Sequence, residues 1–224
     1  MVGEEPVTFS ILAHDPATGR FGGAASTGNL CVGGWVLRGD ARAGVSAAQG
    51  AVPSPLWGQV VLERMAAGME APSAVEEVVA ADPGRAARQL AALGPGGRAG
   101  AFTGEDNPGA KGARLASDLV VSGNMLSHVA VLDAIAEGYA AARGDLELRL
   151  LAALAAGAAA GGDFRGLMSA ALLVVGMEVP TLSLRIDWSD RPIEDLAALY
   201  ARTRDPGYQA WLETVPTLAD PNRR

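Results

Sequence analysis

The chain has 224 residues and a formal net charge of −7, with 49% hydrophobic but only 5% aromatic residues. This length suits one compact domain, and so few aromatic residues predict layers that approach one another closely. The acidic balance, without a basic block, argues against nucleic acid as a partner. The single cysteine, Cys31, excludes an internal disulfide, and with only His14 and His128 beside it we expect neither a metal site nor a cofactor.

No stretch reaches the ~18 uninterrupted apolar residues that a membrane helix needs, because the richest, Leu146 to Ala160, contains charged residues. The first residues are acidic rather than basic and apolar, so they do not form a signal peptide. We therefore expect a cytoplasmic protein with no membrane partner. Residues 1–7 are predicted to be a disordered or non-native leader, residues 8–215 a single domain, and residues 216–224 a loose tail.

Alternation of apolar and small residues between turn residues predicts strands, and apolar residues at three- and four-residue steps predict helices. In chain order the pattern predicts strands Thr8–Ala13, Phe21–Ser26, Cys31–Leu37 and Ala43–Gln49, helices Leu56–Ala67 and Ser73–Ala81, strands Arg88–Leu93, Arg98–Thr103 and Asp118–Ser122, helices Ser127–Ala142 and Leu146–Ala159, strands Ser169–Gly176 and Thr181–Asp187, and helices Pro192–Arg202 and Tyr208–Glu213. Arg38–Asp40 is predicted as a turn, and residues 105–117, which lack a period, as a long surface loop. Ser73 and Glu76 have the spacing of a helix-capping box.

The order of these elements, strands followed by paired helices twice over, indicates the fold class. Strands joined as hairpins favour antiparallel sheets, and each helix pair must cover the outer face of a sheet. The sequence therefore predicts an α/β (α+β) protein built as a four-layer αββα sandwich, with two antiparallel sheets between helical layers.

Thr8 opens the first predicted strand and is the leading candidate for catalysis. A threonine hydroxyl is a weak nucleophile at neutral pH unless a base lies beside it, and a free α-amine on the same residue, with a pKa near ~8, is such a base. Val7 offers an alternative start, because a GTG codon reads as Val inside a gene but initiates with Met. Removal of that Met would leave Thr8 at the terminus; otherwise Thr8 only begins an ordinary hairpin.

Segments along most of the chain resemble domain-of-unknown-function family 1028. The strongest matches are Gly123–Leu126 and Ala160–Gly166, which runs into Ser169–Val174; the others are Thr8–Ala13 with Asp15-Pro16, Ala25-Ser26 before Val32-Gly33, Ala41–Val45 before Gln49, and Ala101–Gly104. The resemblance extends from Thr8 to about Tyr200. It implies an N-terminal-nucleophile (Ntn) hydrolase-like αββα fold, with the threonine after the initiator Met as nucleophile, and it supplies no substrate.

The sequence also departs from the family pattern. In the loop after Gly104, a cysteine followed by Trp-Ala-Gly-His is usual, and the matching positions here are Asn107, Ala110, Lys111, Gly112 and Ala113. Ser122 and Met168 stand where glutamine is common, and Trp188-Ser189 replace an acidic residue and a histidine. If those side chains bind or activate substrate, this member has altered specificity or weakened activity.

The candidate catalytic residues are Thr8, Asn124, Asp163 and Arg165. Asn124 is either a helix cap or an amide donor to a developing oxyanion. Asp163 and Arg165 by themselves suggest a turn aspartate and a solvated arginine; given the resemblance, the arginine is expected to orient the nucleophile or bind a substrate carboxylate. We expect Asn124 and Arg165 to lie within one side-chain length of Thr8.

The candidate substrate-binding residues are Ser26, Gln49, Asn107 and Ser169. The two serines lie at strand ends and are candidates to hydrogen-bond the Thr8 amine, although serine in an alanine-rich strand is unremarkable. Gln49 is a polar residue at the end of an apolar strand, and Asn107 lies in the loop that departs from the family. Cys31 is predicted to belong to the core.

Three kinds of function fit these residues. The first is an amidohydrolase that acts on a small amide or peptide-like substrate through Thr8 once its amine is free. The second is a non-catalytic binding or scaffold protein that keeps the sandwich with a degraded site. The third is a subunit that acts only in an oligomer: the alanine-rich outer helices and Trp211 suit an interface, although ordinary packing explains them equally. We expect a homodimer or larger homo-oligomer.

Overall fold

The computed structural model describes residues 7–161 and 166–224, in which it has ten β-strands, seven α-helices and two short 3-10 helices. In chain order the strands and α-helices are β1 Thr8–Asp15, β2 Arg20–Thr27, α1 Val32–Trp35, β3 Leu37–Asp40, β4 Gly44–Gln49, α2 Pro55–Ala66, α3 Ala71–Ala80, β5 Gln89–Leu93, β6 Ala99–Thr103, β7 Ala110–Ala116, β8 Leu119–Leu126, α4 Ala130–Ala141, α5 Leu146–Ala159, β9 Ser169–Val175, β10 Leu182–Ile186, α6 Pro192–Thr203 and α7 Pro206–Leu212.

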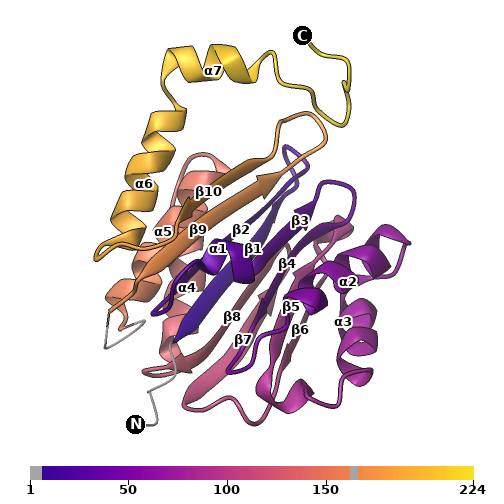
Figure 1. Ribbon diagram of the computed structural model, residues 1–224, viewed down its shortest axis with the longest axis vertical. Coiled ribbons are helices and arrows are strands. Elements are labelled where there is room, and N and C mark those ends of the chain that lie inside the picture. The colour runs from indigo at the N-terminus through magenta and orange to yellow at the C-terminus, as the bar shows by residue number, and fades with distance from the viewer. Residues whose placement is uncertain (1–6, 162–165) are drawn as a thin grey trace.

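The strands form two antiparallel sheets. The larger has six strands in the order β10-β9-β2-β1-β8-β7, and the smaller has four in the order β3-β4-β5-β6. Helices α4, α5 and α6 cover the outer face of the larger sheet, and α2 and α3 cover that of the smaller (Figure 1). The predicted four-layer α/β sandwich, with two antiparallel sheets between helical layers, is therefore confirmed.

The hydrophobic core lies in three layers, one between the sheets and one beneath each helical layer. Because side chains alternate along a strand, β1 divides its residues between two of these layers. Phe9 and Ile11 pack beneath α4 and α5, whereas Leu12 packs between the sheets. Thr8 and Ser10 share the face of Leu12, so the alternation directs both polar side chains into the space between the sheets.

Small residues allow these layers to approach closely, as the low aromatic content predicts. A Cβ added at Gly22 of β2 would lie 2.5 Å from Leu150 Cδ1 of α5. A Cβ added at Gly157 of α5 would lie 2.6 Å from Ile135 Cγ1 of α4. Neither contact is compatible with a larger side chain, so both glycines set the spacing between α5 and its neighbours.

The prediction of a strand over Cys31–Leu37 was wrong. Residues 32–35 form the short helix α1, and the strand that follows, β3, includes the predicted turn Arg38–Asp40. Cys31 adopts a left-handed conformation with φ of 61°, which ends the extended chain before α1. A Cβ at Gly33 would lie 2.7 Å from Ala171 Cβ, so tertiary packing against β9 overrides the local apolar pattern.

Two smaller predictions were also wrong. The supposed loop 105–117 contains β7, which lies at an edge of the larger sheet and is mostly half-buried, so its residues show no clear alternation. Its pairing with β8 is irregular between Ala110 and Gly112. The capping box at Ser73 is absent because α3 begins at Ala71 and is preceded by Glu70.

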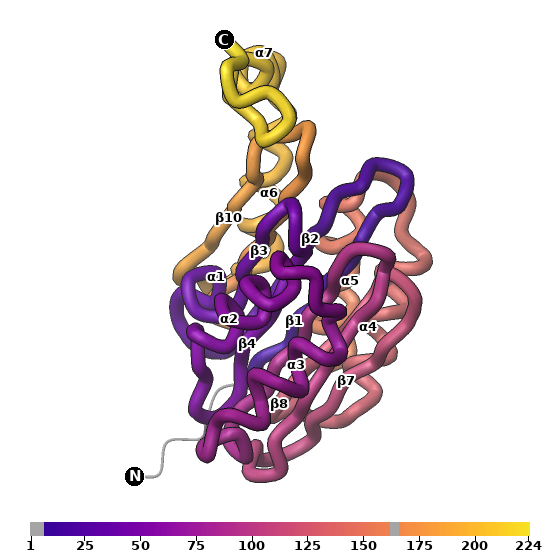
Figure 2. Tube along the Cα trace, turned by 90° about the vertical axis from the view of Figure 1, so that its right-hand side faces the viewer, coloured from indigo at the N-terminus to yellow at the C-terminus, as the bar shows by residue number. Residues whose placement is uncertain are grey.

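The C-terminal part of the chain extends past the layered body. Figure 2 shows α7 beyond the ends of the sheets, joined to them through α6. Residues 216–224 contain turns and irregular backbone, and Ala219 N–H donates a hydrogen bond of 2.9 Å to Met177 O. In the described ranges, no helix has both the length and the apolar character needed to cross a membrane.

Candidate functional site

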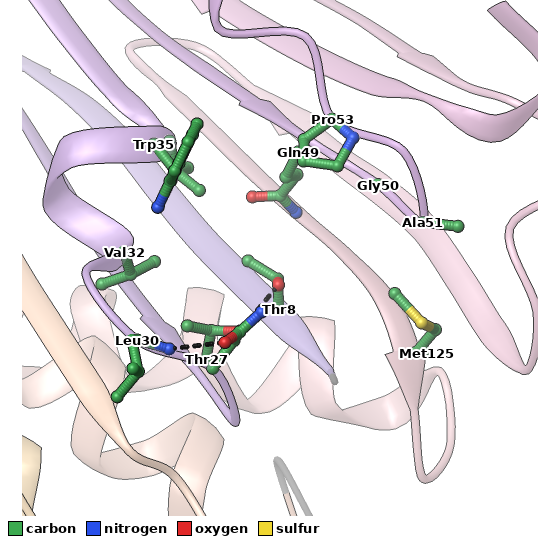
Figure 3. Close-up of a pocket in the computed structure, with 12 residues that line it drawn as sticks. Thr8, Thr27, Leu30, Val32, Trp35, Gln49, Gly50, Ala51, Pro53 and Met125 are labelled. Carbon is green, nitrogen blue, oxygen red and sulfur yellow. Dashed lines mark hydrogen bonds between the residues drawn. The ribbon is translucent and has the colours of Figure 1, made fainter. Parts of the chain in front are cut away.

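Thr8 lies at the floor of a cavity of about 410 Å³ that opens at one end of the space between the sheets. Its side chain is nearly buried, with 8% of the residue exposed. Figure 3 shows Leu30, Val32 and Trp35 on one side of Thr8 and Ala51 and Met125 on the other. The described lining residues are Thr8, Thr27, Asn29, Leu30, Val32, Trp35, Val36, Gln49, Gly50, Ala51, Pro53 and Met125.

The hydroxyl of Thr8 belongs to a short hydrogen-bonded chain. Thr27 Oγ1 donates to the carbonyl oxygen of Val7 at 2.6 Å, and Thr8 Oγ1 lies 3.0 Å from Thr27 Oγ1. Because a hydroxyl carries one proton, Thr8 must be the donor to Thr27. The Gly28 N–H also donates to the Val7 oxygen, at 3.1 Å. Two donors at the cavity floor are therefore occupied by the peptide group that precedes Thr8.

Asn124 lies directly opposite Thr8 on the neighbouring strand β8. Cross-strand partners point to the same face, so its side chain enters the same layer between the sheets. Asn124 Nδ2 donates to Gln89 Oε1 at 3.0 Å, and Asn124 Oδ1 is buried without a hydrogen-bond partner among the described residues. The residue lies inside β8 and caps no helix, so the capping alternative was wrong. Its role as an oxyanion donor stays a prediction.

A buried network of polar side chains holds Asn124 in place, and its central member is Gln89 of β5. Gln89 Oε1 accepts from Asn124 and, at 2.7 Å, from Gln49 Nε2, while its own Nε2 lies 2.9 Å from Gly123 O. On the other side, Gln49 Oε1 accepts from Ser10 Oγ at 2.9 Å, and Ser10 contacts Ser122 Oγ at 2.9 Å. These five side chains are at most 1% exposed, so the network is shielded from water.

Gln89 was missed by the sequence analysis. The signal that could have found it is its position: Gln89 is a polar residue at the start of an apolar strand, just as Gln49 is a polar residue at the end of one. The two are register partners across β4 and β5. A buried polar residue is more informative than an exposed apolar one, because it must find partners. Loss of one partner in such a network typically costs about 1–3 kcal/mol.

One wall of the cavity comes from α1. Val32, Trp35 and Val36 lie at helical steps of three and four residues, so they share one face. Ser169 Oγ accepts from the Val32 N–H at 3.1 Å and donates to Asn29 O at 2.7 Å. The predicted binding residue Ser169 therefore supports this wall from behind and does not line the cavity.

The opposite wall is formed by residues 50–53, which follow β4. Asn107 Oδ1 accepts from the Ala51 N–H at 2.8 Å, and Asn107 Nδ2 lies 3.0 Å from Gly104 O and 3.1 Å from Arg88 O. Its amide is thus engaged with backbone groups, and Asn107 positions the wall without lining the cavity. Of the predicted binding residues, only Gln49 lines the cavity.

Ser26 lies on the other face of the larger sheet. It is the register partner of Phe9, which packs beneath α4 and α5, and its Oγ donates to Ser169 O at 2.9 Å. The alternation of side chains along β2 therefore directs Ser26 away from the cavity, and its contact with a free Thr8 amine stays a prediction. Asp163 and Arg165 lie outside the described residues.

The described part of the lining contains no ionisable side chain. Shifted pKa values occur elsewhere, at exposed pairs and buried tyrosines. The Arg114 guanidinium hydrogen-bonds Asp133 and lowers the pKa of that carboxyl, and burial raises the pKa of Tyr139. Among the described residues, no group of three or more His, Cys, Asp or Glu side chains is placed to hold a metal ion.

Comparison with known proteins gives a match to a family model and matches to solved structures. The crystal structure of protein SPO2555 from Silicibacter pomeroyi, which carries the family model DUF1028, is similar to this chain with a TM-score of 0.93 and 49% sequence identity. The similarity covers 97% of this chain and 98% of that one. No curated protein matches. The model of the family of unknown function DUF1028 matches residues 8–196. The chain therefore belongs to family DUF1028.

Proposed function

We propose that the protein is an N-terminal-nucleophile amidohydrolase that cleaves a small amide or peptide-like substrate through Thr8. The active form begins at Thr8, whose free α-amine is the general base. Asp163 and Arg165 remain candidates to orient the nucleophile or bind substrate, on the basis of the family resemblance. No cofactor is needed for this chemistry.

The reaction has two stages. The Thr8 hydroxyl adds to the carbonyl carbon of the amide, and the Thr8 α-amine accepts the hydroxyl proton. The C–N bond then breaks, the proton passes to the leaving amine, and the acyl group stays on Thr8 as an ester. Water then attacks this ester and gives a proton to the α-amine. As the bond between the acyl carbon and the Thr8 oxygen breaks, the amine passes that proton to the oxygen, which releases the carboxylic acid and regenerates the Thr8 hydroxyl and the free amine.

The observation that carries the proposal is the buried Asn124 Oδ1, which has no partner among the described residues and belongs to the cross-strand neighbour of Thr8. A buried acceptor without a donor costs about 1–3 kcal/mol, so it favours a donor supplied at that position. A free Thr8 α-amine is such a donor. In this role Asn124 accepts a hydrogen bond from the base and orients it.

Removal of residues 1–7 also changes the cavity floor. The Val7 carbonyl oxygen currently accepts from Gly28 N–H and Thr27 Oγ1. Once that carbonyl is gone, both donors are available to the carbonyl oxygen of a substrate as it gains negative charge. Loss of one such donor typically raises the barrier by about 2.7–4 kcal/mol.

The test compares the full-length chain, the chain that begins at Thr8, and the trimmed chain with Thr8→Ala. Each is incubated with a panel of small amides and with an acylating probe, and the adduct is located by mass spectrometry. We expect labelling and turnover only in the trimmed Thr8 form, with a group that titrates near ~8 governing the pH–rate profile.

A trimmed Thr8→Ser variant is the matched control, because it keeps a hydroxyl beside the amine and should retain measurable labelling. Equal labelling in all three main forms would show that Thr8 is not the nucleophile.

The second candidate function is a binding or scaffold protein that retains the sandwich. The observation that favours it is the burial of Val7, 1% exposed, with Thr8 joined to it by an ordinary peptide bond that provides no base. If the native protein is found with Met1 or Val7 intact and is inert, this function replaces the first.

A further inference from the structure

We propose that the cavity above Thr8 selects a substrate whose group next to the reacting carbonyl is uncharged and apolar, such as an aromatic or branched aliphatic amide. That the carbonyl reacts at Thr8 rests on the proposed function. The preference of the cavity for apolar ligands is independent of it.

The lining of the cavity is divided between a polar floor and apolar walls. Three of its four polar side chains, those of Thr8, Thr27 and Gln49, gather at the floor between the sheets. The fourth, Asn29, is exposed, and its Oδ1 accepts from the Leu30 N–H at 2.8 Å; the other described lining residues are apolar. No described lining residue carries a charge that would balance a carboxylate or an ammonium group. Moving such a group from water into this space has a large desolvation cost, whereas an apolar group has none.

Two large apolar side chains at the cavity are partly exposed to solvent. Trp35 is 54% exposed and Leu30 is 46% exposed, and both belong to the same wall (Figure 3). An aromatic side chain at a concave site provides a large contact area for a ligand. Filling the cavity would remove this surface from water, which favours a ligand of matching apolar character.

The wall that carries Trp35 is preorganised before any ligand binds. Gly33 allows α1 to approach β9 and β10 so closely that an added Cβ would lie 2.7 Å from Ala171 Cβ and 2.8 Å from Arg185 Cγ. At the next residue of α1, Arg38 Nη2 donates to Gly34 O at 2.9 Å. These contacts fix the helix that carries Trp35, so little ordering is needed when a ligand binds.

The size of the site fits a small molecule. The cavity volume of about 410 Å³ lies in the range of roughly 300–1,000 Å³ that small-molecule sites usually have. The floor places the polar side chains of Thr8, Thr27 and Gln49 beside the apolar wall, and an amide needs such hydrogen-bonding partners. The geometry thus points to one small amide with an apolar side group.

The experiment measures binding to the full-length chain, in which Thr8 has no free amine. Three amides are compared by ligand-observed NMR titration: phenylacetamide, which is neutral and aromatic; succinamate, which carries a carboxylate; and β-alaninamide, which carries an ammonium group. We expect phenylacetamide to bind at least about tenfold more tightly than either charged amide.

Variants test the proposed wall. Trp35→Ala should weaken phenylacetamide binding about tenfold, and Trp35→Phe should restore most of it. Trp211→Ala is the matched control, because Trp211 is similarly exposed, at 56%, but does not line the cavity, and it should leave binding unchanged.

Equal affinity for the three amides, absence of phenylacetamide binding, or indifference to Trp35→Ala would overturn the inference. Tighter binding of succinamate would overturn it in favour of carboxylate recognition, the role expected of Arg165. Because this assay involves no turnover, its failure is distinct from failure of the proposed function. If the chain binds phenylacetamide selectively but stays inert after trimming, the inference holds and the proposal of an amidohydrolase is wrong.

Discussion

The two layers beneath the helices and the layer between the sheets use buried polar side chains in different ways. In the outer layers, Ser26 and Ser46 each donate to a single backbone carbonyl, of Ser169 and Gly58 respectively. In the inner layer, Gln49 and Gln89 bond to each other and to side chains from both sheets. These two serines are thus satisfied by single backbone carbonyls, whereas the two glutamines of the inner layer join the two sheets.

This difference indicates that the outer layers mainly stabilise the fold, whereas the inner network mainly positions side chains near Thr8. The outer layers are held by apolar contact, which is non-directional and tolerates small shifts of a helix. The inner network depends on hydrogen-bond geometry, so it fixes the angle of Asn124 opposite Thr8. Substitutions in the two kinds of layer should therefore have different effects on stability and on binding.

The largest loss of stability is expected from the outer layer. Leu154 of α5 is fully buried in the layer beneath the helices, and Leu154→Ala should lower the free energy of unfolding by about 3 kcal/mol, because it leaves a cavity. Denaturant titration measures this loss. Phenylacetamide binding by the folded variant should be unchanged; a parallel loss of binding would show that the two layers are not separable.

An intermediate effect is expected from the inner network. Gln89→Leu leaves Gln49 Nε2 and Asn124 Nδ2 without their shared acceptor, which should cost about 2 kcal/mol of stability. The same variant should also weaken phenylacetamide binding, since Gln49 lines the cavity and loses its fixed orientation.

The double variant Gln49→Leu with Gln89→Leu sharpens this test. It removes both partners of the bond between the glutamines, so its loss of stability should be smaller than the sum of the single losses. Strictly additive losses would mean that the two glutamines do not act as one network.

The smallest effect is expected at the surface of an outer layer. Arg114 of β7 forms a salt bridge with Asp133 of α4, and its hydrogen bond lowers the pKa of the carboxyl in the folded protein. A depressed folded-state pKa stabilises the protein above the unfolded value of ~3.9, and this contribution is lost as pH falls through the folded pKa.

Asp133→Asn should therefore reduce slightly the dependence of stability on pH below about pH 4, with little change at pH 7 because exposed pairs contribute weakly. Denaturant titrations at several acidic pH values measure this. Arg114→Gln should have the same effect. If the two variants respond differently, the Arg114–Asp133 pair is not the source of this pH dependence of stability.

Much of the architecture was predictable from local patterns. The bounds of α5 agree with the predicted Leu146–Ala159, and the alternation of β1 was evident from Phe9 and Ile11. Hairpins and helix pairs determine the order of layers, because each apolar face must be covered by a neighbour. The candidate site was predictable only in part: the resemblance pointed to Thr8 and Asn124, whereas Gln89 and the wall formed by α1 were missed.

The sequence by itself determined the elements whose apolar pattern is continuous, and with them the two sheets and their helical covers. Only the tertiary structure decided that Val32 and Trp35 share a wall, because the turn of α1 depends on close packing of Gly33 against β9. It also decided the meeting of Gln49 with Gln89 and of Thr8 with Asn124, which strand register brings together across long stretches of chain. A local pattern specifies which face a residue occupies, but the pairing of strands specifies which residues meet on that face.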